Sequence, residues 1–338
     1  MRPNIFNIAT KELSQDAFIT WLLKFADDAY QSTDPLLNKC GKTFISELIQ
    51  KQNPKFNEAI IKVCAGRQWE NIDVWAEVND KYLIIIEDKT FTGHHSNQLS
   101  RYKEIAEKWC ADNQREQPIC IYLKTGNESL VSLNNIEKQG FSVFTRTDFI
   151  GILEQFKEIN NNIFLDFYER LVKIEELNNE FDKKIINEWN GNDWQGFFQF
   201  LEKEIEGLSW HYVSNQRGGF WCAIPKWCNW DVFPVYLQLE QDKLCFKIST
   251  HQGDTGRETA NPEKKHIRNL FYHLIMQKAK ELNIEGITKP RRFAIGTYMT
   301  TAVVYKENWL GSEQDIINKE DIIKNLNKYL NFLEEVIK

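Results

Sequence analysis

The chain lacks the features of a membrane protein, of a disulfide-rich secreted protein and of a protein that coats nucleic acid. None of its apolar stretches approaches the length of about 18 residues that a membrane-spanning helix needs. Its seven cysteines include no C-x-x-C pair, and its first residues hold no apolar segment typical of a signal peptide. The net charge of −6 argues against a DNA-coating protein, although an enzyme needs only a locally basic cleft. We therefore expect a cytoplasmic protein without membrane contact.

The chain is rich in residues that build hydrophobic cores. Apolar residues make up 42% of its 338 positions, and 11 Trp, 11 Tyr and 22 Phe argue against extensive disorder. This length suits about two domains. Residues 160–190 are rich in Asn, Glu and Lys with periodic Leu, Ile and Phe, which predicts a bridging helix over 164–186. We place the boundary near 180, which gives domains 1–180 and 181–338.

The first domain has an α/β pattern. The apolar run over 118–123 predicts a central strand that is buried on both faces. The other expected strands are 66–78, 82–89 and 141–145, and the expected helices are 12–30, 42–51, 95–109 and a helix from 148 to 156.

The second domain has an α+β pattern built on an antiparallel meander. Alternating segments separated by turn residues predict strands over 210–213, 220–224, 232–239, 244–248 and 293–305. Amphipathic periodicity predicts helices over 262–282 and 312–337. No motif in this half indicates a chemistry, so we expect it to select the substrate or to mediate formation of a homodimer.

The most informative segment is the predicted hairpin around residues 71–89. If Asn79, Asp80 and Lys81 form its loop, Val78 pairs with Tyr82, and counting back sets Asp73 opposite Glu87. One face of the hairpin then becomes uniformly apolar, namely Ile72, Val74, Ala76, Val78, Tyr82, Ile84 and Ile86. A two-residue loop would set Asp73 against Ile86 and mix the faces, so the hydrophobic pattern favours the first register.

This register brings two carboxylates and a lysine to one face. Asp73 and Glu87 would repel each other unless a cation lay between them, and Mg²⁺ is held in proteins by one or two carboxylates. Lys89 follows on the same face, where it could orient a water or stabilise charge on a phosphoryl transition state. The alternative is an ordinary surface ion pair between Glu87 and Lys89.

These residues resemble the PD-(D/E)xK nuclease superfamily. Asp73 followed by Glu87-x-Lys89 after a hydrophobic strand matches its core motif, although Ile72 stands where the family name has proline. Gln98-Leu-Ser-Arg-Tyr102 resembles the QxxxY motif of exonuclease-like branches, and the segment from Glu12 to Leu23 resembles the first helix of one bacterial branch. The resemblance covers roughly residues 1–175.

The resemblance implies a restriction-endonuclease-like core, a mixed sheet flanked by helices, and an Mg²⁺-dependent nuclease in which Mn²⁺ could substitute. Asp73, Glu87, the backbone carbonyl of Asp88 and Glu12 would hold the metal, and Lys89 would position the attacking water. Gln98 and Tyr102 would complete the catalytic site. The implied partner is nucleic acid, DNA in preference to RNA, and the implied context is bacterial defence against phage or restriction. The alternative is a nuclease-like module that binds nucleic acid or protein without cutting.

Several other residues have a simpler structural interpretation. Asp16 is expected on a solvated helix edge, and a catalytic role for His94 or His95 is disfavoured because magnesium prefers oxygen ligands. Tyr102 could be a core residue with Gln98 on the helix surface. Trp221, Trp227 and Trp230 could stack on bases but more often fill a small core. Basic residues that could contact phosphate or form a solvated face are Lys264, Lys265, His266, Arg268, Arg291 and Arg292.

Overall fold

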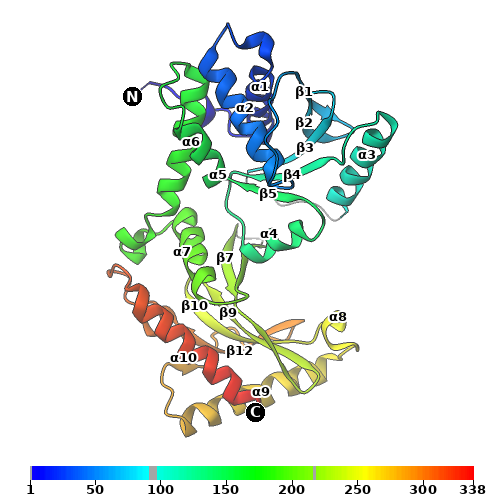
Figure 1. The fold of residues 1–338 in the computed structure, drawn as a ribbon. Helices are drawn as coiled ribbons and strands as arrows, with labels where there is room; N and C mark the ends of the chain where they lie inside the picture. The colour runs from blue at the N-terminus through cyan, green and yellow to red at the C-terminus, as the bar shows by residue number, and fades with distance from the viewer. Residues whose placement is uncertain (1, 91–96, 216–217) are drawn as a thin grey trace. The chain divides into compact units, whose positions relative to one another are not determined.

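The computed structural model describes residues 2–90, 97–215 and 218–338, and its fold is drawn in Figure 1. The chain divides into two compact units, each with its own hydrophobic core. The first comprises Met1–Glu128 with Ser132–Glu176, and the second comprises Leu177–Lys338 with Ser129–Val131. No helix among the described residues is long and apolar enough to cross a membrane.

The first unit is built on a mixed sheet in the order β1-β2-β3-β4-β5. β1, β2 and β3 pair antiparallel, whereas β3, β4 and β5 are parallel. β3 lies at the centre, and every one of its residues is buried. The strands are β1 (Val63–Trp69), β2 (Ile72–Val78), β3 (Tyr82–Lys89), β4 (Ile119–Lys124) and β5 (Ser142–Thr145).

Helices cover both faces of this sheet, as the α/β pattern predicts. One core lies between the sheet and α1 (Glu12–Phe25), α2 (Pro35–Gln50), α5 (Arg146–Glu154) and α6 (Asn162–Asn178). A smaller core on the other face is covered by α3 (Gln98–Asp112), seen at the edge of the sheet in Figure 1, and by α4 (Leu130–Glu137). The sequence pattern did not predict α4.

Several predicted elements of this unit have wrong bounds. The helix expected over 12–30 ends at Phe25, and the helix expected over 42–51 begins at Pro35. The single strand expected over 66–78 is two strands, because Glu70 and Asn71 both adopt left-handed backbone angles (φ 52° and 68°) that make a tight turn. The helix expected over 164–186 ends at Asn178 as α6. The expected start of α3 near residue 95 lies outside the described residues.

The second unit contains an antiparallel sheet in the order β11-β12-β10-β9-β7-β6, with β8 paired to β9. This arrangement confirms the predicted α+β class. Its strands are β6 (Ser209–Asn215), β7 (Gly218–Ile224), β8 (Trp227–Trp230), β9 (Phe233–Glu240), β10 (Lys243–Ser249), β11 (Ile287–Thr288) and β12 (Tyr298–Tyr305). Its helices are α7 (Gly191–Glu204), α8 (Gln252–Thr255), α9 (Asn261–Glu281) and α10 (Lys319–Ile337). The sequence analysis missed α7 and β8.

The last helix starts later than the predicted residue 312. Asn318 is its N-cap, and its side-chain oxygen accepts hydrogen bonds from the backbone N–H groups of Glu320 (3.0 Å) and Asp321 (3.3 Å). We expect Asn318→Ala to lower the free energy of unfolding by about 1 kcal/mol, because these donors lose their acceptor. Asn318→Asp keeps an acceptor and should stay close to the wild type in urea denaturation. Equal losses in both variants would contradict the capping role.

Candidate active site

The β2–β3 hairpin has the predicted register. Val78 pairs with Tyr82 and Val74 with Ile86, and Asn79 and Asp80 take left-handed angles (φ 54° and 51°) in the three-residue loop. The predicted apolar face packs against α1 and α2, except that Ile72 joins the core on the α3 side. Ile72 directly follows the tight β1–β2 turn, where the alternation of the strand begins.

The end of β3 brings Asp73, Glu87 and Lys89 together. Lys89 Nζ forms an ion pair with Glu87 Oε1 and lies 3.5 Å from Asp73 Oδ2 and 3.2 Å from the carbonyl oxygen of Asp88. Asp73 Oδ2 also accepts a hydrogen bond of 3.0 Å from the backbone N–H of Asp88. Glu87 is 1% exposed and Lys89 is 7% exposed, so these charges lie in a largely dry environment.

Burial dominates the electrostatics of this cluster. It raises the pKa of Glu87 to about 7, and the nearby Asp73 carboxylate adds to the effect. Burial also opposes the charge of Lys89, but Glu87 and Asp73 outweigh it and hold the pKa of the amine above its usual value. Apart from the ion pair with Lys89, neither carboxylate oxygen of Glu87 has a hydrogen-bond partner among the described residues. A buried carboxylate with an unsatisfied oxygen is suited to binding a cation.

On the opposite face of β3, the side chain of Asp88 belongs to a second polar cluster, which links the strand to α1. Gln15 donates a hydrogen bond to Asp88 Oδ1 and accepts one of 2.7 Å from the hydroxyl of Thr125. Asp16 is 1% exposed beside Asp88, so the expected solvated position of Asp16 is wrong. Burial, followed by the charge of Asp73, raises the pKa of Asp16 to about 6. The Asp88 side chain is therefore part of this α1 contact.

Glu12 also contacts the end of β3. Its Oε1 accepts a hydrogen bond of 3.0 Å from the backbone N–H of Thr90, and its charge helps to raise the pKa of Lys89. Glu12 and Asp16 are one helical turn apart, which places both on the side of α1 that faces the sheet. That spacing was the sequence signal that could have placed Asp16 correctly.

The sequence analysis missed a third group, on β4. The parallel register sets Tyr122 beside Glu87 and Lys124 beside Lys89. Lys124 is 4% exposed, lies 3.3 Å from Glu128 and has a pKa lowered by burial against the opposing effect of that carboxylate. The Tyr122 hydroxyl donates to Glu128 at 2.9 Å. A lysine that ends a strand buried on both faces was the available signal.

The structure places Gln98 and Tyr102 together on α3. The Gln98 side-chain amide donates a hydrogen bond of 3.1 Å to the Tyr102 hydroxyl. Tyr102 is 2% exposed and packs in the core beneath α3 with Leu83 and Ile85. Their part in catalysis stays a prediction, and His94 and His95 lie outside the described residues.

Two of the weaker candidates of the second unit, Trp230 and Arg268, are structural, whereas Lys265, His266, Arg291 and Arg292 are exposed. The ring of Trp230 packs against Phe271, whereas Trp227 stacks on Tyr236 with a centroid distance of 4.0 Å and remains 46% exposed. Arg268 is 6% exposed and donates to the carbonyl oxygen of Phe293 at 2.7 Å, so it does not lie on a solvated face.

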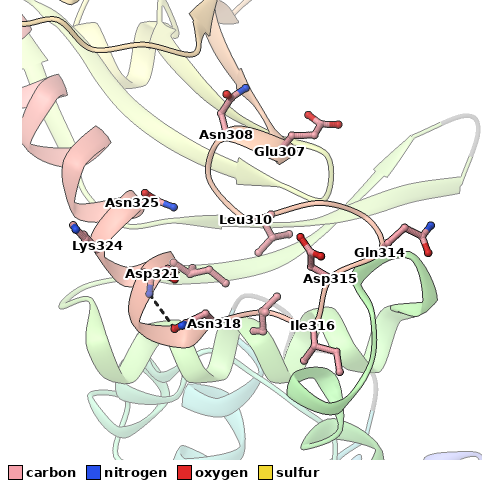
Figure 2. A pocket seen from close by; sticks show the side chains of 13 residues that line it. Glu307, Asn308, Leu310, Gln314, Asp315, Ile316, Asn318, Asp321, Lys324 and Asn325 are labelled. Carbon is pink, nitrogen blue, oxygen red and sulfur yellow. Dashed lines mark hydrogen bonds between the residues drawn. The ribbon is translucent and has the colours of Figure 1, made fainter.

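A hollow of about 690 Å³ at the start of α10 is also polar (Figure 2). Its side chains serve the local fold. Asp315 accepts a hydrogen bond from the backbone N–H of Ser312 at 3.2 Å, and Asn318 caps α10. We assign no chemistry to this hollow.

Residues 3–190 match the model of the PD-(D/E)XK nuclease superfamily. The match spans more than half of the chain and includes the whole β2–β3 hairpin, so the chain belongs to this superfamily. Comparison with curated proteins and with solved structures gave no match. Nucleases of this superfamily typically use divalent metals and act on nucleic acid.

Proposed function

We propose that the protein is a metal-dependent nuclease that hydrolyses DNA phosphodiester bonds. The observation that carries this proposal is the buried Glu87 carboxylate, which lies beside Asp73 and Lys89 and has an oxygen without a hydrogen-bond partner among the described residues. A purely structural ion pair needs one carboxylate, and the second one raises the pKa of Glu87 through the repulsion between the two negative charges. A site for a cation and a phosphate explains all three charges.

The donor set fits Mg²⁺, with Mn²⁺ as a substitute. Asp73, Glu87, the carbonyl of Asp88 and Glu12 would hold the ion, which when bound would polarise a phosphoryl oxygen and lower the pKa of a water. The described residues contain no group of three His, Cys, Asp or Glu side chains that could hold a metal. One or two of these three carboxylates at a time, together with the carbonyl oxygen and waters, would therefore complete the coordination, which suits Mg²⁺ because it retains waters readily.

The chain's own charges would act on the phosphate and the water. Lys89 keeps its proton at neutral pH because its two carboxylate neighbours favour the charged form. Its ammonium would orient the attacking water and stabilise charge that develops on the phosphoryl oxygens. Lys124, one strand further along the same sheet, adds a second buried amine on this side.

The broader context rests on analogy with the superfamily. We propose a cytoplasmic enzyme of bacterial defence or restriction that prefers DNA to RNA. Residues 181–338 would select the substrate or form a homodimer.

The direct test is incubation with linear, circular and single-stranded DNA and with RNA, in Mg²⁺, Mn²⁺ or EDTA. We expect cleavage of DNA with either metal and none in EDTA. Cleavage in EDTA would contradict the metal dependence, and cleavage of RNA alone would contradict the substrate.

The second candidate is a nuclease-like module that binds nucleic acid or protein without cutting. It is favoured by the burial of Glu87 and Lys89, which are 1% and 7% exposed and already paired with each other. The presence of Asp73, Glu87 and Lys89 in contact favours the enzyme. Tight binding of a nucleic acid that is never cleaved with Mg²⁺ or Mn²⁺ would support the module.

Gln98 and Tyr102 give a further test of the site. If they support the metal-bound water or the scissile phosphate, Gln98→Ala should lower turnover about 10- to 100-fold, because a small misplacement of reacting groups is costly. Its melting temperature should change little. Tyr102→Phe should be milder than Tyr102→Ala, which also removes a buried ring worth about 3–5 kcal/mol. Normal turnover per folded Gln98→Ala molecule would remove Gln98 from the site.

A further inference from the structure

A small pocket on the α3 side of the first unit is walled by three tryptophans. Its volume is about 110 Å³, and its lining residues are Trp69, Trp75, Trp109, Glu77 and Leu83. The three indoles come from β1, β2 and α3 and are only partly buried. The proposed hydrolysis uses none of these side chains.

The rings are held in place by their neighbours. Trp69 lies 6.0 Å from Trp109 and 6.5 Å from Trp75, in edge-to-face arrangements at 75° and 64°. The Trp75 indole lies across Gly66 of β1, its partner in the ladder, where a Cβ would come within 2.8 Å of the ring. Only glycine at this position leaves room for the ring. The pocket therefore has rigid aromatic walls.

The one carboxylate in the pocket is already neutralised. Glu77 Oε1 accepts from Arg115 Nε at 2.8 Å and pairs with its Nη2 at 2.6 Å. Aromatic rings alone can attract an ammonium group, but the guanidinium of Arg115 lies beside this pocket and repels a second cation, so a cationic ligand is disfavoured. A flat neutral ring suits the walls better, and a fixed carboxylate can still accept a hydrogen bond from an exocyclic amine such as that of cytosine.

The pocket lies next to the candidate active site. Trp75 follows Asp73 by two residues on β2, so the two side chains lie on one face and about 7 Å apart along the strand. Across the ladder, Trp75 pairs with Ile85, and Glu87 follows two residues later on the same face of β3. A strand whose phosphate reached Asp73 would bring a neighbouring base to the tryptophans.

We propose that the three-tryptophan pocket stacks an unpaired base of the strand that is cleaved. The proposal rests on the proposed nuclease function and narrows its substrate to single strands, ends or flaps. The pocket of about 110 Å³ is smaller than an apolar cavity of about 150 Å³ that encloses benzene, but it is open to solvent, so one face of a single pyrimidine ring can stack in it. Bases that remain in a duplex are paired and stacked and cannot enter it.

The test is a binding experiment in EDTA, where metal-dependent cleavage does not interfere. A labelled oligodeoxycytidine and an oligonucleotide of equal length with abasic sites are titrated against the wild type, Trp109→Leu, Trp109→Phe and Trp21→Leu. Fluorescence anisotropy gives the affinities, and melting temperatures confirm that the variants fold. Trp21 is the matched control, because it is a partly buried tryptophan of the same unit that packs on the opposite face of the sheet.

Trp109→Leu should weaken binding of oligodeoxycytidine about tenfold, as expected for one stacked base, and should change binding of the abasic strand less than about twofold. Trp109→Phe should retain most of the affinity, and Trp21→Leu should match the wild type. Any of three results would overturn the proposal that the pocket stacks a base. Trp109→Leu could weaken binding of both strands equally, it could weaken neither, or the wild type could fail to bind oligodeoxycytidine.

A parallel cleavage assay with Mg²⁺ or Mn²⁺ separates the two proposals. Cleavage without any base-specific effect of Trp109→Leu would reject the pocket alone. A base-specific effect without cleavage of any substrate would reject the nuclease and retain the pocket.

Discussion

Asp73→Ala and Lys89→Ala are each expected to reduce DNA cleavage at least about 100-fold while leaving the fold intact. Asp73 contributes a carboxylate to the proposed metal site, and Lys89 lies 3.5 Å from it with its ammonium also paired to Glu87. Loss of the carboxylate removes a metal ligand. Loss of the amine removes stabilisation of transition-state charge, an effect of about 2.7–4 kcal/mol for one donor in a comparable site. Initial rates with Mg²⁺ and circular dichroism spectra measure the two effects.

The same hairpin supplies a matched control. Lys62 and Asp80 form an ion pair at 2.8 Å near the β2–β3 turn, and their side chains are 63% and 50% exposed. Removing either charge changes a solvated pair that contributes little to stability. Asp80→Asn, which removes the charge but tolerates the left-handed angle of the loop, and Lys62→Ala should therefore cleave at the wild-type rate. Robust cleavage by Asp73→Ala would rule out its assignment to the site.

The central hairpin could be predicted from the sequence because its information is local. Alternation along residues 72–78 and 82–86 allows one register that keeps an apolar face, and the observed ladder has that register. Neighbouring residues therefore suffice to bring Asp73 near Glu87. The family motif Glu87-x-Lys89 adds the prediction that Lys89 belongs to the same site.

The burial of Asp16 and Lys124 could not be predicted in the same way. Each side chain is buried by partners that are distant in the sequence. Asp16 lies beside Asp88, and Lys124 lies beside Lys89 of β3. A charged residue read alone is expected on the surface, because burial without a partner is costly. β3 and β4 are parallel and are joined by a crossover through α3. Their register therefore cannot be counted from a short loop as it can in a hairpin. The α7 helix begins at a capping box between Asn190 and Asp193, a local signal that the sequence analysis did not use.

The hydrogen-bond network that surrounds Arg146 lies behind the candidate site, and replacing Arg146 tests whether this network stabilises the first unit. It is 5% exposed at the start of α5, and its guanidinium donates to Glu175 (2.8 Å), to the carbonyl oxygen of Thr125 (2.7 Å) and to Asn127 (2.9 Å). Thr125 in turn donates to Gln15, which binds Asp88 on the central strand. Arg146 therefore fixes the segment after β4 against α1 and β3.

Arg146→Met should lower the free energy of unfolding of the first unit by about 3–5 kcal/mol, because Glu175 and the Thr125 carbonyl lose the buried cation that they bind. Urea denaturation followed by circular dichroism measures the change. Lys173→Met is the control, since Lys173 forms an ion pair of 3.8 Å with Glu176 in which both side chains are 58% exposed, and its removal should cost less than about 1 kcal/mol. A loss below 1 kcal/mol in Arg146→Met would mean that water replaces the guanidinium and that the network does not hold Thr125 in place.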